Sequence, residues 1–420
     1  MTVRWITPLL CTGPGTEVAT VPDAVVIDVR SFVDRAGNTP AAMREKLLAG
    51  AKALNEGKRT FVCCDHGISR SNAFAAGILA VAENIPFEES LRKIIEATGE
   101  SEIRADVVAD MQRALADHLS GQTSSSGKQK WLLTGGGSAL GSLILRSAPD
   151  DIEILAPTRE EVDLQLGSVS LGLYARSHGI TRFLHFASPR IGNTNRAMGE
   201  ALSMLRTVLE TAGAIGVPMF MPSRWEVFAG YSGDVSPVTE ETASRPAGIL
   251  GDTKFLAEAL ALQHENQKRV PVTILRSGLV VGETVAPHFL RSFIRKAKAG
   301  EPIVTHTYEN GSPKLDLIAA EDWLSAFWLL ARSGLTGLFQ AGGGDLISTR
   351  AIAELICSAA GPGCRTEELT LEGRAANIKL VSDKLTRATG WQPTRPITDT
   401  LNRYIEAALA PELRAESGTK

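Results

Sequence analysis

Short apolar runs of strand length alternate along the chain with longer stretches whose apolar residues recur at helical spacing. Before residue 119 this pattern predicts strands at Ala24–Val29 and Arg59–Cys64, and helices near Pro40–Leu54, from Ser69 and over 102–118. After residue 129 it predicts strands at Lys130–Thr134 and near 151–155, 183–187, 217–221 and 271–275, with helices between them. Because strands that alternate with helices at this spacing form parallel sheets, we expect an α/β fold in both halves.

Residues 120–128 (SGQTSSSGK) interrupt this alternation with small polar residues. Such residues bury too little apolar surface to order the backbone, so the stretch predicts a flexible linker. We therefore expect a first domain over 1–119, a linker over 120–128, a second domain over 129–411 and a short tail over 412–420.

Composition restricts the possible partners and the compartment. With 44 Lys+Arg against 47 Asp+Glu, the 420-residue chain has no basic excess for nucleic acid. No run approaches the roughly 18 apolar residues of a membrane span, and the opening MTVRWITPLL lacks a signal-peptide layout. We expect a cytoplasmic protein. The five cysteines have irregular spacings, which predict neither a disulfide framework nor a metal site.

The segment RTFVCCDHGISRSNAFAAGIL predicts a strand that delivers Cys64 to a tight loop, followed by a helix from about Arg70. Backbone N–H groups of such a loop converge with the helix N-terminus and bind anions. The same positive field favours the nucleophilic thiolate of Cys64. Arg70 has the planar fork that binds two phosphate oxygens. Gly67 permits the backbone geometry of the loop, and Ser71 is placed to donate to the leaving thiolate.

The string C-x-x-G-x-S-R-S, here Cys64 to Ser71, resembles the active-site loop of the dual-specificity branch of protein tyrosine phosphatases. The resemblance covers roughly residues 5–118 and implies hydrolysis through a phospho-cysteine, with Gly67 and Ser69 among the substrate-binding residues. It also implies an upstream aspartate that protonates the leaving oxygen; Asp34 matches best, and Asp28 is the alternative.

Two residues of this loop depart from the family pattern. The position before the nucleophile is usually His and is Cys63 here, which we interpret as a buried strand residue with a redox role as the lesser option. Asp65 adds a negative charge to the loop, and His66 is expected only to tune its shape.

The second domain begins with KWLLTGGGSALGSLIL, an apolar strand that runs through glycines into a helix. Such glycines allow the backbone to approach a pyrophosphate at a helix N-terminus. The order of elements from about 129 to 410 resembles the extended short-chain dehydrogenase/reductase family, which includes nucleotide-sugar epimerases, dehydratases and reductases. The resemblance implies a Rossmann doubly wound domain with a small C-terminal substrate lobe, and an NAD or NADP cofactor.

The cofactor-binding residues implied by this resemblance follow the family pattern T-G-x-x-G-x-x-G. They are Thr134, Gly135, Ser138 in place of the middle glycine, its neighbour Gly137, Gly141, Asp163 beside the adenine, Ala187 in HFASP along the nicotinamide ribose, and Lys254. After the second strand the chain has Thr158 and Arg159 rather than an acid, which suits a 2′-phosphate and slightly favours NADP.

The catalytic set of the family is incomplete. Its Y-x-x-x-K motif has Lys254 but Leu250 at the tyrosine position, and a leucine cannot transfer a proton. The position of the Ser/Thr that polarises the substrate is Arg224, with Ser223 one place earlier. The substrate-binding candidates are Ser223, Arg224, the nearest tyrosine Tyr231, and the arginine of the Leu275-Arg276 pair in ILRSGLVVG.

Two interpretations of function stay open at this point. In the first, a cysteine-dependent phosphatase is fused to a reductase- or epimerase-like domain, and both act on a phosphorylated sugar or nucleoside-like metabolite. In the second, only the phosphatase is catalytic, and the dinucleotide fold senses NADP(H) or binds a partner. Under both we expect a small phosphorylated substrate, no nucleic-acid or membrane partner, no metal, and a possible homodimer.

Overall fold

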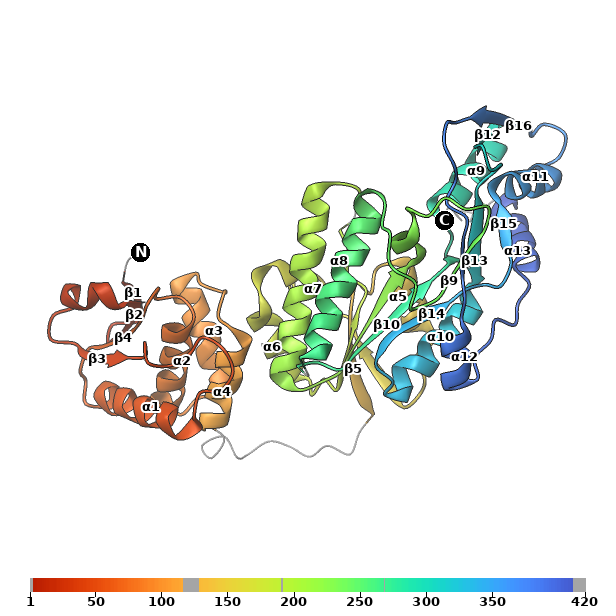
Figure 1. Ribbon diagram of the computed structural model, residues 1–420. Helices are drawn as coiled ribbons and strands as arrows, with labels where there is room; N and C mark the ends of the chain where they lie inside the picture. Colours follow the sequence, from red (N-terminus) through yellow and green to blue (C-terminus); the bar gives the residue numbers. More distant parts are fainter. Residues whose placement is uncertain (1–2, 116–127, 190–191, 268, 411–420) are drawn as a thin grey trace, which may run out of the picture. The chain divides into compact units, whose positions relative to one another are not determined.

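The computed structural model describes residues 3–115, 128–189, 192–267 and 269–410, and Figure 1 shows how their elements follow one another. Most of the predicted linker, 120–127, and the predicted tail, 412–420, lie outside the described residues. The division into domains at 119 and 129 therefore stays a prediction. Within the described residues, no helix combines the length and the apolar character that crossing a membrane requires.

The N-terminal sheet is mixed rather than purely parallel. Its strands, in the spatial order β1-β2-β4-β3, are β1 (Arg4–Thr7), β2 (Leu10–Pro14), β4 (Thr60–Cys64) and β3 (Val25–Asp28). β2 and β3 run parallel to β4 as predicted, but β1 pairs antiparallel with β2. The Thr7 hydroxyl accepts hydrogen bonds from the N–H groups of Leu9 and Leu10, at 3.3 and 3.0 Å. This closes a short turn, and only antiparallel strands can be joined so tightly.

Successive side chains of β4 lie on opposite faces of this sheet, as in any strand. Val62 and Cys64 belong to the main core, which the sheet forms with the helices α1 (Pro40–Asn55), α2 (Arg70–Glu83), α3 (Phe87–Thr98) and α4 (Ala105–Leu115). Phe61 and Cys63 lie in a second cluster with Cys11, next to the 3-10 helix η1 (Gly15–Thr20). Cys63 is therefore a buried strand residue, and it points away from Cys64.

The larger sheet has six strands in the order β14-β10-β8-β7-β5-β6. They are β14 (Gly337–Ala341), β10 (Val272–Ser277), β8 (Met219–Arg224), β7 (Arg182–His185), β5 (Gln129–Thr134) and β6 (Ile152–Leu155). The chain order reverses between β5 and β7, as at the switch point of a doubly wound fold. The usual order 3-2-1-4-5-6 has one more strand beyond the second. Here only the short helices η2 (Leu164–Leu166) and α6 (Ser168–Ser177) separate β6 from β7, so the described part of this sheet ends at β6.

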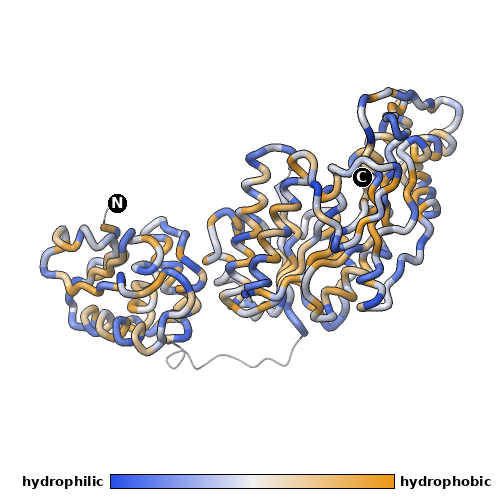
Figure 2. The backbone as a smooth tube through the Cα atoms, viewed as in Figure 1, coloured by the Kyte–Doolittle hydropathy of each residue, from blue (hydrophilic) through white to orange (hydrophobic). Residues whose placement is uncertain are grey.

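Helices cover both faces of this sheet, whose central strands are mostly apolar (Figure 2). They include α5 (Ala139–Arg146), α7 (Asn195–Ile215), α8 (Gly248–Asn266) and α10 (Ala320–Ser333). Phe327 of α10 packs edge-on against Phe220 of β8, with ring centroids 4.9 Å apart. On the next strand Arg276 bonds Glu258 of α8. Because Arg276 is in register with Ser223, three residues after Phe220, α8 and α10 lie on opposite faces (Figure 1).

A smaller group of elements follows toward the C-terminus. It contains the sheet β11 (Leu279–Val281), β13 (Lys314–Ala319) and β15 (Leu346–Ser348), the pairs β12 (Ile303–Thr307) with β16 (Thr366–Thr370) and β9 (Ser236–Val238) with β17 (Ile378–Leu380), and the helices α9 (His288–Ala299), α11 (Thr349–Ala360), α12 (Asp383–Thr389) and α13 (Ile397–Leu409). Leu317 of β13 is buried in one core with Ile352 of α11 and Leu401 of α13.

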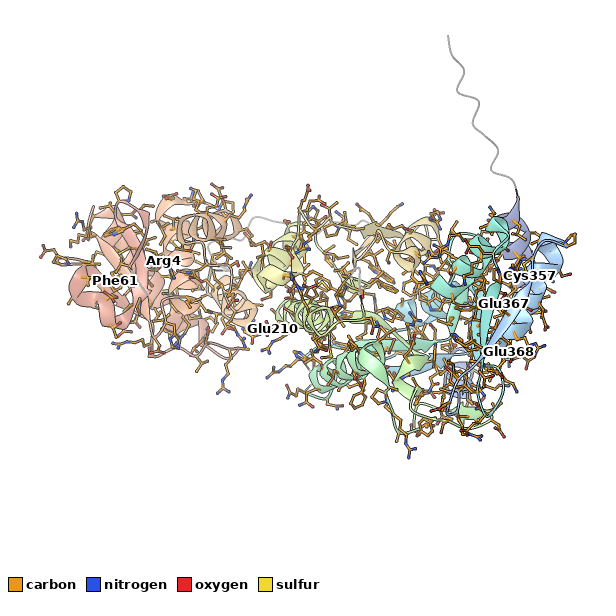
Figure 3. All side chains as sticks on the ribbon, turned by 90° about the horizontal axis from the view of Figure 1, so that it is seen from above. Arg4, Phe61, Glu210, Cys357, Glu367 and Glu368 are labelled. Carbon is orange, nitrogen blue, oxygen red and sulfur yellow. A yellow bond between two sulfur atoms is a disulfide. The ribbon has the colours of Figure 1, made fainter. Side chains whose placement is uncertain are left out.

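Cys357 and Cys364 form one disulfide, which the irregular cysteine spacings did not predict (Figure 3). Gly361 ends α11 with a φ of +92°, and its N–H group donates to the Cys357 carbonyl at 3.1 Å. The Cys364 N–H group then donates to the Gly361 carbonyl, also at 3.1 Å. These bonds fold the chain back, so the two Cα atoms lie 5.0 Å apart despite the irregular spacing in sequence.

Candidate functional sites

The Cys64 thiol lies at the end of β4, inside the loop predicted to bind phosphate. Its Sγ accepts a hydrogen bond from the Gly67 N–H group at 3.2 Å and lies 3.4 Å from Ser71 Oγ. Gly67 has a φ of +70°, and a Cβ there would come within 2.5 Å of the Gly13 carbonyl carbon on β2. Glycine is therefore required by the backbone conformation and by the close approach of β2. The loop wraps around the sulfur as the sequence predicts.

The helix α2 begins directly after this loop, at Arg70. Ser69 at its N-cap position makes no capping bond with its side chain, so the hydroxyl does not occupy the first N–H groups of the helix. Free N–H groups at a helix N-terminus bind anions. The structure thus brings Cys64, Gly67, Ser69, Arg70 and Ser71 together.

The Arg70 guanidinium is held by acceptors from two segments of the chain. Nη1 donates to the carbonyl oxygens of Arg30 and Phe32, at 3.1 and 2.7 Å. Nη2 donates to Asp65, the residue after the nucleophile. This hydrogen bond is the main reason why the pKa of the Asp65 carboxyl lies below its usual value. The sequence reveals Asp65 as an added charge but does not reveal that it binds Arg70.

Asp34 lies beside the loop, because its Oδ1 accepts a 2.6 Å hydrogen bond from Ser69 Oγ. The alternative acid, Asp28, is in a two-point ion pair with Arg30, whose Nε and Nη2 lie 3.0 and 2.6 Å from the two carboxylate oxygens. That pairing lowers the Asp28 pKa, which keeps the group ionised and makes it a poor proton donor. Of the two predicted candidates, the geometry favours Asp34.

A buried polar pair that the sequence analysis missed holds the segment that carries Asp34. The Asn38 amide nitrogen donates to the Val33 carbonyl at 2.9 Å and to Asp110 Oδ2 at 3.0 Å. Asp110 is completely buried on α4. A charged residue within the apolar stripe of an amphipathic helix is the signal in the sequence that would have indicated it.

The glycine turn of the larger sheet is built for close backbone approach. Gly135 has a φ of +78°, and a Cβ there would lie 2.5 Å from the Phe186 carbonyl carbon. A Cβ on Gly141 would lie 2.4 Å from the Gly135 carbonyl oxygen, whereas Gly137 faces open space. Ser138, which replaces the middle glycine, caps α5 by accepting the Gly141 N–H at 3.1 Å. The serine therefore takes one of the donors that a pyrophosphate would use.

Thr134 connects this turn to the end of β7. Its Oγ1 lies 2.9 Å from His185 Nδ1 and accepts the Ala187 N–H at 3.4 Å. Burial, and secondarily the charge of Lys254, lowers the pKa of His185 to about 3, so its imidazole is neutral. Thr134, Gly135 and Ala187 thus meet at the carboxyl ends of β5 and β7, where doubly wound sheets bind ligands.

The two residues expected on the adenosine side bind each other. Arg159 Nε donates to Asp163 Oδ2 at 3.1 Å, and Asp163 Oδ1 caps η2 by accepting the Gln165 N–H at 2.9 Å. The Arg159 side chain is 78% exposed. It remains accessible to an anion, while Asp163 has a local structural role as well.

Lys254 lies one helical turn after Leu250 on α8, which is the spacing of the incomplete family motif. Burial and the positive charge of Arg224 lower its pKa. Arg224 is in turn paired with Glu226, with Nη2 2.6 Å from Oε1. Arg224 thus places a charge near Lys254 where the family has a Ser or Thr hydroxyl, and the apolar Leu250 stands where the family has the tyrosine.

Two predicted substrate residues have internal partners. The Tyr231 hydroxyl donates to the Ala243 carbonyl at 2.9 Å, and its ring lies 4.7 Å below the Arg245 guanidinium. Arg276 is 4% exposed and is paired with Glu258 through Nε and Nη2, at 2.9 and 2.6 Å. The prediction that Arg276 meets substrate does not fit this position, because the side chain lies in the interior.

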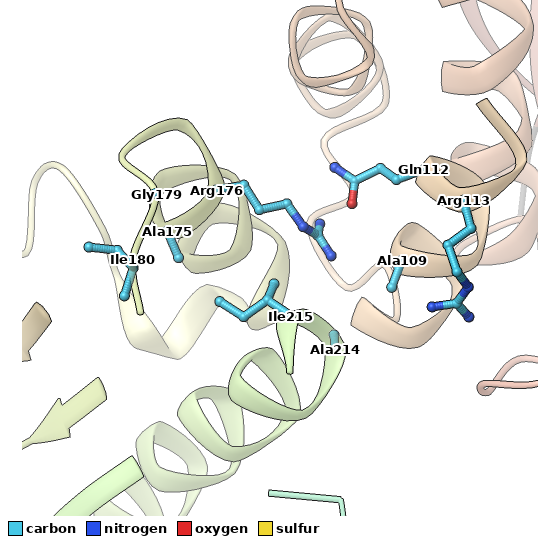
Figure 4. A pocket seen from close by; sticks show the side chains of 9 residues that line it. All are labelled: Ala109, Gln112, Arg113, Ala175, Arg176, Gly179, Ile180, Ala214 and Ile215. Atoms are coloured by element: carbon cyan, nitrogen blue, oxygen red, sulfur yellow. The ribbon is translucent and has the colours of Figure 1, made fainter. Parts of the chain in front are cut away.

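Ser223, Arg276 and Gln340 are in register across β8, β10 and β14, and all three side chains are buried. The pocket drawn in Figure 4 is a different feature, lined in part by Ala175 and Ile215 at the ends of α6 and α7. No residue predicted as a site residue is among its lining residues in the described chain.

Comparisons with known proteins identify the larger domain. Residues 131–339 match the sequence model of the NAD dependent epimerase/dehydratase family. That match leaves the residues before 131 uncovered, so the resemblance of 5–118 to a phosphatase stays a prediction. No curated protein matches the sequence.

Similar solved structures share the fold at low sequence identity. dTDP-glucose 4,6-dehydratase of Bacillus anthracis in complex with NAD has 18% identity and a TM-score of 0.58, over 66% of this chain and 96% of its own. RMD of Pseudomonas aeruginosa complexed with NADPH has 20% identity and a TM-score of 0.58, over 67% of this chain and 99% of its own. UDP-glucose 4-epimerase of Thermotoga maritima with UDP-glucose has 18% identity and a TM-score of 0.57, over 66% of this chain and 98% of its own. The larger domain of this chain therefore has a Rossmann fold, and residues 131–339 are similar to the NAD dependent epimerase/dehydratase family.

Proposed function

We propose that the larger domain binds a nicotinamide dinucleotide at the turn from Gly135 to Gly141. The observation that carries this proposal is the close approach at Gly135. The backbone of Phe186 lies so near that a Cβ on Gly135 would meet it. Thr134, Gly135 and Gly137 would hold the pyrophosphate, and Ala187 and Lys254 would hold the nicotinamide ribose. The family match and the NAD and NADPH complexes of two similar structures support this assignment. Arg159, largely exposed, favours NADP through its 2′-phosphate.

The bound cofactor would supply hydride chemistry, but the residues beside it offer no phenol to carry the matching proton. Leu250 occupies that position, and the neutral His185 is bonded to Thr134. Glu226 is engaged by Arg224. We therefore propose cofactor binding as the function of this domain, with epimerase or reductase turnover as the alternative that an assay decides.

Calorimetry with NAD(H) and NADP(H) tests the proposal. Gly137→Leu directs a side chain into the open space before the turn without a structural clash, so it should abolish binding. Gly199→Leu is the matched control, because Gly199 of α7 also faces open space. Absence of binding to the unmodified chain would contradict the proposal. Because an epimerase regenerates its cofactor, turnover is followed by chromatography of the sugar nucleotide, and cofactor binding without conversion of UDP-glucose would favour a sensor over an enzyme.

A second function, hydrolysis of phosphate monoesters, is favoured by the cradle around Cys64. In the proposed reaction the Cys64 thiolate attacks phosphorus, and the bond to the ester oxygen breaks as Asp34 gives that oxygen a proton. Water then attacks the phospho-cysteine and returns a proton to Asp34, which releases phosphate and the thiolate. Ser71, 3.4 Å from Sγ, would stabilise that thiolate as it leaves.

The substrate of this second function would be a phosphorylated sugar or nucleoside-like metabolite, which is the kind of molecule that a fused dinucleotide-binding domain could share. Hydrolysis of an aryl phosphate by the whole chain tests the chemistry. Cys64→Ser and Arg70→Lys should abolish it, and an inactive unmodified chain would contradict it.

A further inference from the structure

Asp65 bonds Arg70 in the place where a bound phosphate would be expected to do so. Both terminal nitrogens of the guanidinium are engaged by acceptors of the chain itself, Nη2 by Asp65 and Nη1 by the Arg30 and Phe32 carbonyls. These contacts use three of the five guanidinium N–H donors, and an oxyanion that takes the Nη2 donor bonded to Asp65 must displace that carboxylate.

Asp65 is the acceptor that can leave most easily. The two carbonyl groups belong to the segment that Asn38 fixes to the buried Asp110. The Asp65 side chain, in contrast, is 53% exposed, so water can solvate its carboxylate once it has left Arg70. The Arg70 side chain is only 11% exposed, which keeps it in place while its partner changes.

The charge of Asp65 also favours its departure from Arg70 when an oxyanion binds. Asp65, like any exposed aspartate, is ionised at neutral pH, and the hydrogen bond from Arg70 lowers its pKa further. It directly follows the nucleophile in sequence, so a phosphate dianion at Cys64 meets a like charge on the same loop. Like charges at such separation repel each other, and the repulsion is only partly screened by salt.

We infer that Asp65 is an internal competitor of the substrate phosphate for Arg70, and that this competition sets the oxyanion affinity of the loop. An arriving oxyanion displaces the carboxylate from the guanidinium, and Asp65 moves into solvent. The inference rests on the proposed phosphatase function, since it concerns the same loop.

Tungstate, which has the charge and shape of a phosphate but is not hydrolysed, serves as the probe in calorimetry on the whole chain. Asp65→Asn keeps the shape of the side chain and removes its charge. It should bind tungstate about fivefold more tightly and lower KM for an aryl phosphate by a similar factor. Glu45→Gln removes the same charge from the exposed side of α1 and should change neither value.

Weaker or unchanged tungstate binding by Asp65→Asn, in a protein that hydrolyses aryl phosphate, would overturn the inference and leave the phosphatase function intact. It would mean that Asp65 positions Arg70 rather than competing with the ligand. Absence of both tungstate binding and hydrolysis in the unmodified chain would overturn both. If Asp65→Asn does not fold, Asp65→Ser is measured in the same way, with the same tightening expected.

Discussion

The carboxylate of Asp34 accepts a 2.6 Å hydrogen bond from the hydroxyl of Ser69, a residue of the loop that surrounds Cys64. Ser69 Oγ also accepts the Arg104 N–H at 3.1 Å, so the serine hydroxyl has its donor and an acceptor position both in use. The segment that carries Asp34 and the loop around Cys64 are thus joined directly.

Asp34→Asn should lower kcat for an alkyl phosphate by about 10²- to 10⁴-fold, the usual contribution of a general acid. The loss should be much smaller for 4-nitrophenyl phosphate, whose leaving group needs little protonation. Asp28→Asn is the comparison, because the ion pair with Arg30 keeps Asp28 ionised and makes it a poor proton donor. A larger loss in Asp28→Asn than in Asp34→Asn, measured with the same two substrates, would reverse the assignment.

Ser71→Ala should slow the second half of the proposed phosphatase reaction. Ser71 Oγ lies 3.4 Å from the sulfur, where it can stabilise the thiolate that leaves the phospho-cysteine. Rapid mixing with 4-nitrophenyl phosphate should then give a burst of one nitrophenolate per site, followed by a slow steady state. Equal slowing of burst and steady state would show that Ser71 instead serves the first step.

Glu258→Ala should lower the free energy of unfolding by about 3–5 kcal/mol, since it leaves the buried Arg276 without its carboxylate partner. Replacing both residues, as Glu258→Leu with Arg276→Met, should cost much less, because no buried charge is left unpaired. Urea unfolding of the two variants measures the difference. A double variant less stable than Glu258→Ala would contradict the argument.

Gln340→Met should raise the free energy of unfolding by about 1 kcal/mol. Among the described residues, neither the amide oxygen nor the amide nitrogen of Gln340 has a hydrogen-bond partner, although the side chain is completely buried. Methionine has a similar length and no polar group to desolvate. A loss of stability in urea would indicate that ordered water bonds this amide.

Asp316 should make the protein more stable as pH falls from neutrality toward pH 4. Burial raises its pKa from 3.8 to about 6, against the opposing effect of N–H bonds from Gly343 and Leu380. Between pH 3.8 and about pH 6 the folded chain therefore binds a proton that the unfolded chain does not. Over that interval the free energy of unfolding rises by about 3 kcal/mol as pH falls. Unfolding of Asp316→Asn should lack this pH dependence, and an identical pH profile in both proteins would refute it.

The elements that form from local pattern were predictable from the sequence. α2 begins at Arg70, as expected from the string Cys64 to Ser71, and β5 ends at Thr134 ahead of the glycine turn. In both places the residue types themselves impose the backbone, through glycines at positive φ and apolar strands before them.

Features that depend on distant partners were not predictable in this way. Nothing in the order of residues shows that Arg276 turns toward Glu258 on α8 rather than toward a ligand. The pairing of β1 with β2 depends on a turn whose polar group, Thr7, is common in strands as well. The bond between Asp65 and Arg70 needs the three-dimensional loop, because neighbouring residues in sequence do not face each other until the chain is bent.

The arrangement of Cys63 and Cys64 on β4 has a consequence for engineering. Consecutive side chains of one strand enter two separate cores, yet they share a single backbone. We expect a change of volume at Cys63, beside η1, to act on that shared backbone and so on the position of the neighbouring sulfur. A substitution at Cys63 would thus adjust the Cys64 thiol from the opposite face of the sheet.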